Sequence, residues 1–177
     1  MKNPRNIFLV GLMGAGKTTV GRNLARRLAK DFKDTDHEIE ARTGVRVPVI
    51  FEIEGEEGFR RREAETVALL TELDNVVLAT GGGAVIDPGN REHLKERGWV
   101  IYLHARPVEL AKRLGRDRSR PLLQGVNPRL RLEELYQARD PLYREVADLV
   151  MDTGRQSANV LAEQLIAKLD TACRLSA

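Results

Sequence analysis

Several residue types that define common protein classes are scarce in this chain of 177 residues. A single cysteine excludes an intrachain disulfide scaffold and a cysteine-rich structural zinc site. Three scattered histidines do not favour a histidine-based metal site. Internal repeats and low-complexity linkers are also missing from the sequence. The length therefore predicts a single domain over residues 1–177.

Long apolar runs are missing as well, although 42% of the residues are hydrophobic, which suffices for a packed core. The run Ile7–Ala15, preceded by Lys2 and Arg5, resembles a short signal peptide. It is much shorter than the roughly 20 residues that a membrane-spanning helix needs. We therefore expect a cytoplasmic protein without a membrane partner.

The excess of positive charge is small and confined to one stretch. The chain has a net charge of +3, whereas residues 106–144 alone carry +5 and the remainder carries −2. Nine of the ten basic residues in that stretch are arginines, which suit bidentate contacts with carboxylates and phosphates. Only Tyr136 and Tyr143 accompany them as aromatics, so a nucleic-acid partner is not expected. A solvated helix face is the alternative interpretation.

Short apolar runs alternate with amphipathic stretches along the chain. This alternation is typical of βαβ units, which form a parallel sheet covered by helices on both faces. Ligands of such sheets bind at the carboxyl ends of the strands. The predicted strands are 7–10, 76–79, 99–103 and 149–151. One helix is predicted to begin at 17, and five more are predicted at 56–73, 90–97, 107–114, 128–146 and 157–172.

The strand at 7–10 runs into a glycine-rich loop at 11–18, which reads GLMGAGKT and matches the pattern G-x-x-x-x-G-K-[ST]. Glycines permit the backbone conformations that point successive N–H groups at a phosphate. Lys17 would reach the β- and γ-phosphates, and the Thr18 hydroxyl would face Mg²⁺. The loop therefore predicts a nucleotide-binding site.

An acidic partner for the metal is expected elsewhere, because the strand at 76–79 ends in Thr80 and glycines rather than in an aspartate. The nearest candidates are Asp34 and Asp36. In an extended segment their side chains would project on the same side, which favours a shared cation or substrate hydroxyl. Alternatively, Asp36 caps the N-terminus of a helix.

Two further features favour an anionic small ligand. Gly81, Gly82 and Gly83 follow a buried strand and could leave backbone N–H groups open to it, or could simply form a flexible turn. The run FRRRE at 59–63 is a candidate anion clamp, and helical geometry lets only some of its arginines face one site.

Taken together, these motifs resemble the shikimate kinase family over nearly the whole chain. The resemblance implies a three-layer α/β/α P-loop kinase fold with a five-stranded parallel sheet in the order 2-3-1-4-5 and a mobile lid at about 114–127. The motifs are, in chain order, GLMGAGKTT at 11–19, FKDTDHEIE at 32–40, TG at 43–44, IFEIEGEEGFR at 50–60, ATGGG at 79–83, RSRPLL at 118–123 and ARDPLYREVAD at 138–148.

The resemblance also implies an activity, which is the ATP-dependent phosphorylation of the 3-hydroxyl of shikimate during aromatic amino-acid biosynthesis. ATP would be the co-substrate and Mg²⁺ the metal. Lys17, Asp36 and Arg120 match the family's catalytic residues. The nucleotide-binding matches are Gly14, Ala15, Gly16, Lys17, Thr18, Thr19, Arg120 and, for adenine, Arg155.

The remaining matches concern shikimate and the metal. Thr18 and Asp34 match the residues that hold Mg²⁺, Asp34 through water. Asp36 matches the aspartate that contacts the shikimate hydroxyls and orients or deprotonates the attacking oxygen. The other substrate-binding matches are Arg60 and Arg139 for the carboxylate and Gly81, Gly82 and Gly83 for the pocket lining. Arg60 lies, like Asp36, in the predicted substrate-binding region of about 34–63, and the others follow it in the chain.

One segment departs from the family pattern, and two alternatives remain. Residues 45–49 read VRVPV where the family usually has a small or acidic residue, although proline is tolerated in a first helical turn. A gluconate kinase of the same fold is the nearest rival, and a nucleotide-dependent regulatory protein that binds RNA is a different class. A monomer is the default oligomeric state, and Cys173 is expected to be an incidental thiol.

Overall fold

The computed structural model of the chain describes residues 3, 5–115 and 120–175, and the side chains of 173–175 are not described. Residues 116–119 of the predicted lid and the Cys173 thiol therefore lie outside the described part. The strands are β1 (Ile7–Val10), β2 (Asp31–Asp34), β3 (Val76–Ala79), β4 (Trp99–His104) and β5 (Leu149–Asp152). The helices are α1 (Lys17–Arg27), α2 (Thr35–Thr43), α3 (Val47–Leu70), α4 (Pro88–Arg97), α5 (Pro107–Leu114), α6 (Pro128–Val146) and α7 (Ala158–Leu175), with the 3₁₀ helices η1 (Ala84–Ile86) and η2 (Pro121–Leu123).

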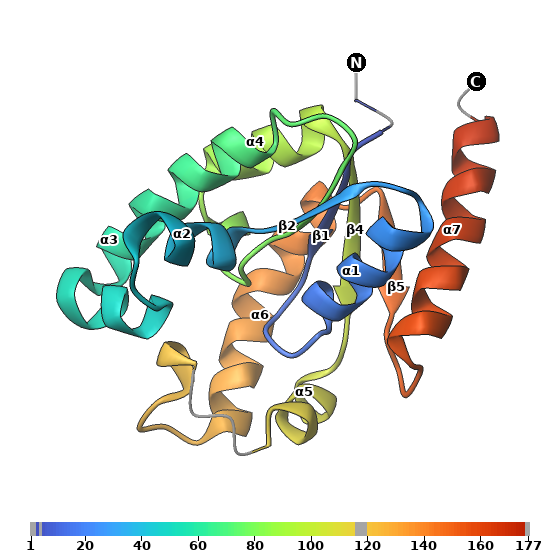
Figure 1. Ribbon diagram of the computed structural model, residues 1–177. Coiled ribbons are helices and arrows are strands. Elements are labelled where there is room, and N and C mark those ends of the chain that lie inside the picture. The colour runs from blue at the N-terminus through green and yellow to red at the C-terminus, as the bar shows by residue number, and fades with distance from the viewer. Residues whose placement is uncertain (1–2, 4, 116–119, 176–177) are drawn as a thin grey trace.

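The five strands form one parallel sheet in the order β2-β3-β1-β4-β5, which confirms the topology implied by the sequence (Figure 1). β1 lies at the centre, with Leu9 opposite Ala79 on one side and Ile101 on the other. All four residues of β1 and of β3 are buried, as expected of strands that are covered on both faces. The loops that follow β1 and β3 therefore meet at one edge of the sheet.

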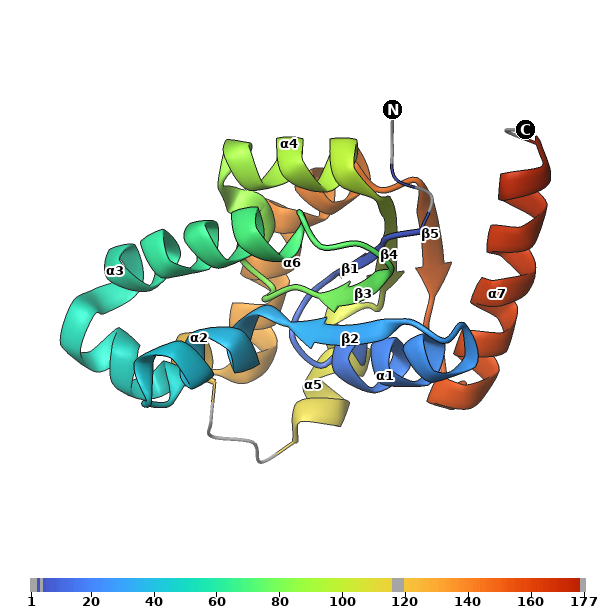
Figure 2. The same ribbon diagram turned by 45° about the horizontal axis from the view of Figure 1, so that its top comes forward.

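Helices cover both faces of the sheet and complete three layers. α1 and α7 pack together on one face, and α4 and α6 lie on the other, with α3 against α4 (Figure 2). The main core lies between these layers and includes Leu161, Leu165 and Leu169, the apolar stripe of α7. A second, smaller core of Ile39, Ile50 and Phe59 joins α2 to α3.

Two elements were not predicted from the residue pattern. β2 reads DFKD and lies at the edge of the sheet, so it has no buried apolar run that would reveal a strand. α2 has almost no amphipathic pattern and buries only Thr35 and Ile39. α3 consists of two helical segments that meet at Gly55, whose backbone angles are not helical. The second segment begins at 56, as predicted, and ends at Leu70 rather than at 73, whereas the first begins at Val47 with Pro48 in its first turn. Proline at a helix start is thus accommodated, as expected.

Within the described ranges, no helix is both long and apolar enough to cross a membrane.

Candidate active site

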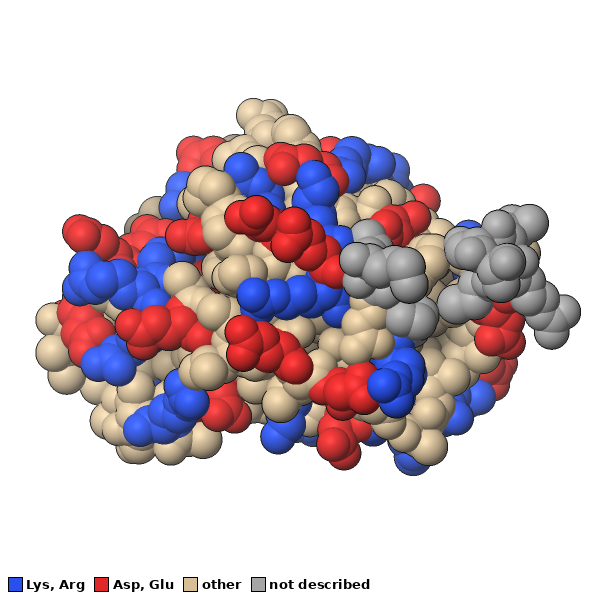
Figure 3. Space-filling view, turned by 90° about the horizontal axis from the view of Figure 1, so that it is seen from above, with Lys and Arg blue, Asp and Glu red and all other residues tan. Residues whose placement is uncertain are grey.

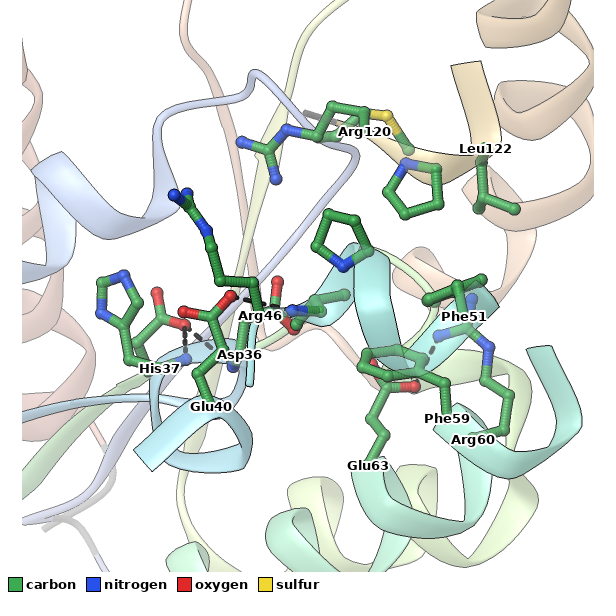
Figure 4. Close-up of a pocket in the computed structure, with 18 of the residues that line it drawn as sticks. Asp36, His37, Glu40, Arg46, Phe51, Phe59, Arg60, Glu63, Arg120 and Leu122 are labelled. Atoms are coloured by element: carbon green, nitrogen blue, oxygen red, sulfur yellow. Dashed lines mark hydrogen bonds and ion pairs between the residues drawn. The ribbon is translucent and has the colours of Figure 1, made fainter. Parts of the chain in front are cut away.

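A cavity of about 280 Å³ opens at the carboxyl ends of the strands. Its lining combines the loop after β1, the start of α2, both segments of α3, the glycines after β3, η2 and α6. In Figure 4, Asp36, Arg120 and Glu63 approach the cavity from different sides. The predicted site residues that line it are Thr18, Asp34, Asp36, Arg60, Gly81, Gly82, Gly83, Arg120 and Arg139.

The phosphate loop has the backbone that its glycines predict. Gly11, Gly14 and Gly16 all have positive φ angles, of 147°, 82° and 94°. A Cβ on Gly11 would also lie 2.6 Å from the backbone oxygen of Leu103 in β4. α1 begins directly after Gly16, so its first free N–H groups face the loop. This is a shape that can hold a phosphate by backbone contacts.

Lys17 is buried at the base of this loop. Its ammonium donates hydrogen bonds to the carbonyl oxygens of Gly11 at 2.6 Å and Leu12 at 2.9 Å. Burial lowers the pKa of Lys17 to about 8, and the positive charge of Arg120 acts in the same direction. A phosphate placed here would offset both effects, since a negative neighbour favours the charged form of an amine.

Thr18 and Asp34 meet at the cavity edge, where the Thr18 hydroxyl donates to Asp34 Oδ2 at 2.8 Å. Asp34 Oδ1 accepts hydrogen bonds from the backbone N–H groups of Asp36 and His37. Asp34 is therefore the N-cap of α2, and the predicted cap role of Asp36 is wrong. The premise of one extended segment is also wrong, because β2 ends at Asp34 and Asp36 lies in the first turn of the helix.

The pairing of Thr18 with Asp34 fits Mg²⁺. Mg²⁺ prefers hard oxygen ligands and usually takes only one or two from the protein, with water and phosphate oxygens completing its shell. The described part of the chain has no group of three or more His, Cys, Asp or Glu side chains that could hold a metal. One hydroxyl and one carboxylate are thus the donor set that a nucleotide-bound Mg²⁺ would use.

Asp36 faces the cavity in a setting that makes its carboxylate a stronger base. Burial raises its pKa, and the negative charge of Asp34 raises it further, whereas Lys17 and Arg120 act in the opposite direction. Burial and a like charge both penalise ionisation. A hydroxyl group of a ligand could therefore donate a strong hydrogen bond to the Asp36 carboxylate.

Gly81, Gly82 and Gly83 mainly provide space, and not all of their backbone N–H groups are open to a ligand. None of them has a positive φ. The Gly81 N–H is already used, because it donates to the Thr35 hydroxyl at 2.8 Å, so the expectation of three free amides is wrong for Gly81. A Cβ on Gly81 would lie 2.6 Å from Glu63 Oε2, and one on Gly83 would overlap the Arg60 guanidinium. The glycines thus let charged side chains of α3 reach the sheet edge.

Two arginines and one glutamate form the far end of the cavity. Arg60 donates to Glu63 Oε1 at 2.6 Å and to Glu56 at 3.3 Å. These acids raise the pKa of Arg60 although burial opposes them, and burial lowers that of Arg139, which is only 4% exposed. Three buried polar atoms at this end have no hydrogen-bond partner among the described residues, namely Arg60 Nε, Glu63 Oε2 and Arg139 Nη1.

Buried polar atoms are normally hydrogen-bonded, and exceptions of this kind point to a ligand or a catalytic role. Both guanidinium groups offer donors into the cavity, which suits a carboxylate. The neighbouring arginines of the run 60–62 do not take part, because Arg61 pairs with Glu57 and Arg62 with Glu54 on the outside of α3. Helical geometry therefore selects Arg60 alone, as expected.

Sequence reasoning missed two residues of this end. Glu63 is 1% exposed, and burial raises the pKa of its carboxyl against the influence of Arg60. Its signal was the spacing of three from Arg60, which places both on one helix face. Tyr143, one turn after Arg139, donates to the carbonyl oxygen of Gly82 at 2.5 Å. It thereby ties the glycine turn to α6.

A second hollow of about 250 Å³ lies on the other side of the phosphate loop and is the candidate base site. Its lining includes the predicted residues Gly14, Ala15, Gly16, Thr19 and Arg155. Arg113, which was not predicted, also lines it and donates to Thr153 Oγ1 at 2.9 Å and to the Gly154 carbonyl at 2.5 Å. The loop thus lies between two hollows, one on each side.

The basic stretch 106–144 divides between the two hollows and the surface. Arg120 and Arg139 line the first hollow and Arg113 the second. Other arginines of the stretch pair with acids of their own helix, namely Arg106 with Glu109, Arg131 with Glu134 and Arg144 with Asp140. Figure 3 shows basic and acidic side chains interspersed on the face it presents. The local charge excess is thus only partly a property of the site.

Comparisons with known proteins agree with the family resemblance seen in the sequence. The family model described as shikimate kinase matches residues 13–170. A shikimate kinase of Thiobacillus denitrificans is 61% identical over 170 residues, which cover 96% of this chain and 93% of that protein. One of Burkholderia thailandensis is 59% identical over 167 residues, which cover 94% and 91%.

Solved structures agree with this similarity. A shikimate kinase from Acinetobacter baumannii in complex with shikimate is 49% identical, with a TM-score of 0.94, over 97% of this chain and 96% of that chain. A gluconokinase from Sinorhizobium meliloti is 15% identical, with a TM-score of 0.57, over 97% and 95%. The second likeness reflects a common fold alone.

Proposed function

The chain belongs to the shikimate kinase family, and from this membership we propose how its residues transfer the γ-phosphoryl group of ATP to the 3-hydroxyl of shikimate. The observation that carries the assignment of roles is the division of one cavity into two ends. Thr18 and Asp34 lie at the end beside the phosphate loop, and the unpartnered donor of Arg139 lies at the other.

At the phosphate end, the backbone N–H groups of residues 14–19 hold the β-phosphate, and Lys17 and Arg120 neutralise charge on the transferring group. Thr18 and Asp34 would hold Mg²⁺, which supplies further neutralisation when it is bound. Phosphoryl transfer depends mainly on alignment and charge neutralisation, so these contacts account for most of the chemistry. Arg155 contacts the adenine in the second hollow.

At the other end, Arg60 and Arg139 bind the shikimate carboxylate, and Glu63 holds Arg60 in place. Gly81, Gly82 and Gly83 let the ring lie against the sheet edge. Asp36 accepts a hydrogen bond from the attacking hydroxyl and takes its proton as the bond from that oxygen to the γ-phosphorus forms, while the bond from the γ-phosphorus to the β–γ bridging oxygen breaks and ADP leaves. The raised pKa of Asp36 supports this role, because a base is most effective when its pKa approaches the working pH.

We also propose that the protein acts as a cytoplasmic monomer in which residues 114–127 form a lid over ATP. In support of the lid, Arg120, Pro121 and Leu122 of this segment line the first hollow. Closure of such a segment would exclude water and limit ATP hydrolysis.

The test is a coupled assay of ADP release with shikimate or gluconate as acceptor. We expect turnover with shikimate and none above background with gluconate, because the chain is 49% identical to a shikimate kinase in complex with shikimate and shares only its fold with a gluconokinase. Turnover with gluconate alone would contradict the assignment of the acceptor. ATP consumption that neither acceptor stimulates, together with salt-sensitive RNA binding, would favour a regulatory protein instead.

A further inference from the structure

The cavity wall nearest to α2 comes from a short helical segment that is set apart from the rest of its helix. Val47, Pro48 and Phe51 line the cavity from the first part of α3, whereas Arg60 and Glu63 line it from the second part. The two parts are separated at Gly55, whose φ of 69° and ψ of −179° are not helical. That region of the backbone map is essentially restricted to glycine. Figures 1 and 2 show the bend of α3 beside α2.

One ion pair bridges this bend. Arg62 Nε and Nη2 donate to Glu54 Oε2 and Oε1 at 2.8 and 2.7 Å, so the pair is bidentate. The pKa of Glu54 is lowered by its hydrogen bonds with Arg62, and that of Arg62 is raised by the same contacts. A separation of eight residues is too long for a pair within one regular helix, where neighbours are three or four apart. The bend itself brings the two side chains together.

Gly58, which lies between Glu54 and Arg62 in the chain, makes the contact between these two side chains possible. A Cβ on Gly58 would lie 2.5 Å from the Glu54 Cβ and 3.2 Å from Glu54 Oε2. Gly58 therefore leaves the space that the Glu54 side chain occupies on its way to Arg62. Gly55, Gly58, Glu54 and Arg62 thus form one local unit, in which two glycines permit the geometry and two charges fix it.

The other end of the wall segment is held by different contacts. The Val47 N–H donates to Glu40 Oε1 at 3.0 Å, and Ile50 belongs to the small core with Ile39 and Phe59. At the Gly55 end, Ile53 is 77% exposed and contributes little packing. Apolar contacts also span the bend, because Ile50 and Phe51 pack against Phe59 of the second part, with the centroids of the two phenyl rings 4.7 Å apart. Among the side-chain hydrogen bonds and ion pairs of the described residues, only Glu54–Arg62 joins 47–54 to 56–70.

We propose that Glu54 and Arg62 are positioning residues for the acceptor, because their ion pair, together with the packing of Phe51 on Phe59, sets the angle between the two parts of α3 and so places Val47, Pro48 and Phe51 against the shikimate ring. The inference rests on the proposed function, since it assigns shikimate to this cavity. Neither residue lines that cavity. Their effect is therefore transmitted through the backbone at Gly55.

The same helix provides a matched control. Glu57 and Arg61 form an exposed ion pair at 3.1 Å, but both lie after Gly55. The two pairs share their residue types and the same helix, and they differ in whether they bridge the bend. If the loss of a surface arginine is all that matters, Arg62→Ala and Arg61→Ala should change shikimate affinity equally. If the ion pair across the bend positions the cavity wall, only Arg62→Ala should change it.

The experiment measures shikimate affinity by calorimetry and steady-state kinetics for the unaltered protein, Arg62→Ala, Glu54→Ala, the double variant and Arg61→Ala. Exposed ion pairs are weak, so we expect the Kd and KM for shikimate to rise only about threefold to fivefold in Arg62→Ala and Glu54→Ala. The double variant should be no worse than either single one, because both remove the same pair. The KM for ATP, kcat at saturating shikimate and the values of Arg61→Ala should stay unchanged.

Unchanged shikimate affinity in both single variants would overturn the inference, and so would an equal loss in Arg61→Ala. A lower melting temperature without a change in KM would indicate a purely structural pair and would also overturn it. Failure of the unaltered protein to phosphorylate shikimate would instead overturn the proposed function and, with it, the inference. The two kinds of failure are thus separated by the unaltered protein.

Discussion

The two ends of the cavity are built in opposite ways. The phosphate end is built mainly on one continuous stretch, residues 11–18, whose shape depends on backbone angles and whose lysine donates to two loop carbonyls, with Asp34 beside Thr18. The far end gathers Asp36, Arg60, Glu63 and Arg139 from α2, α3 and α6 and depends on side-chain charges. Its buried polar atoms are partly without partners.

The difference indicates where the molecule sacrifices stability for binding. A buried polar atom without a partner costs free energy on the order of 1–3 kcal/mol in proteins. The far end carries three such atoms, which a bound carboxylate or hydroxyl could satisfy. The phosphate end carries its strain in glycines, where it is small. Variants at the two ends should therefore affect different substrates and change stability differently.

The largest effect is expected for Lys17→Met, which removes a cation from the phosphate end. We expect kcat to fall by at least about a thousandfold, as for the loss of a cation that stabilises charge on a transferring phosphoryl group. Shikimate affinity measured by calorimetry should remain close to that of the unaltered protein. A kcat within tenfold of the unaltered protein would remove Lys17 from the chemistry.

Asp36→Asn should come next, with kcat about a hundredfold to a thousandfold lower, as for loss of a general base. ATP affinity should be retained. The raised pKa of Asp36 means that ionisation is penalised in the folded state, so the neutral amide should raise the melting temperature at pH 7. Near-normal turnover would exclude Asp36 as the base, and a lower melting temperature would contradict the electrostatic argument.

Gly83→Ala tests the far end of the cavity by adding one methyl group without changing any charge. Its Cβ would overlap the Arg60 guanidinium, so we expect displacement of Arg60 and a KM for shikimate about tenfold higher, consistent with loss of one charge-assisted contact. The KM for ATP should not change. Gly82→Ala is the comparison variant, because its Cβ would lie at 3.4 Å or more from its neighbours. Equal effects in the two variants would argue against the displacement of Arg60.

The smallest effect is a pH dependence of ATP binding. Because the pKa of Lys17 is about 8 and a phosphate favours the charged form, ATP should bind the protonated state. Affinity should then fall about fourfold between pH 7 and pH 8.5, as the fraction of charged Lys17 falls. Calorimetry in buffers of different ionisation enthalpy should detect proton uptake at pH 8.5. Lys17→Met should show neither effect, and uptake that persists in it would assign the proton to another group.

The contrast between the two ends also governs how much could be predicted from the sequence. The phosphate loop and the buried strands 7–10 and 76–79 are local patterns, and both strands have the predicted bounds. The polar edge strand β2 and the helix α2 have no such pattern, so the relation of Asp34 to Asp36 was predicted wrongly. Buried apolar runs identify strands, whereas polar edge segments depend on tertiary contacts.

At the far end, residue types alone left the glycines and the arginine run ambiguous. The resemblance to a family singled out Arg60 and Arg139, and the structure brings both to one cavity. Glu63 and Tyr143 were missed because their roles depend on contacts with Arg60 and Gly82. The Tyr143–Gly82 contact joins segments that are 61 residues apart, which no short motif encodes. The spacing of three between Arg60 and Glu63 is local, but the exposed pair Arg61–Glu57 has a similar spacing, so spacing alone does not identify the buried pair.

The most direct test of the two-ended site is a crystal structure with shikimate and a non-hydrolysable ATP analogue. We expect the shikimate carboxylate within hydrogen-bond distance of Arg60 and of Arg139 Nη1, a ring hydroxyl on Asp36, and the triphosphate along the N–H groups of residues 14–19. A shikimate carboxylate bound at the phosphate loop, with Arg139 Nη1 still without a partner, would contradict it.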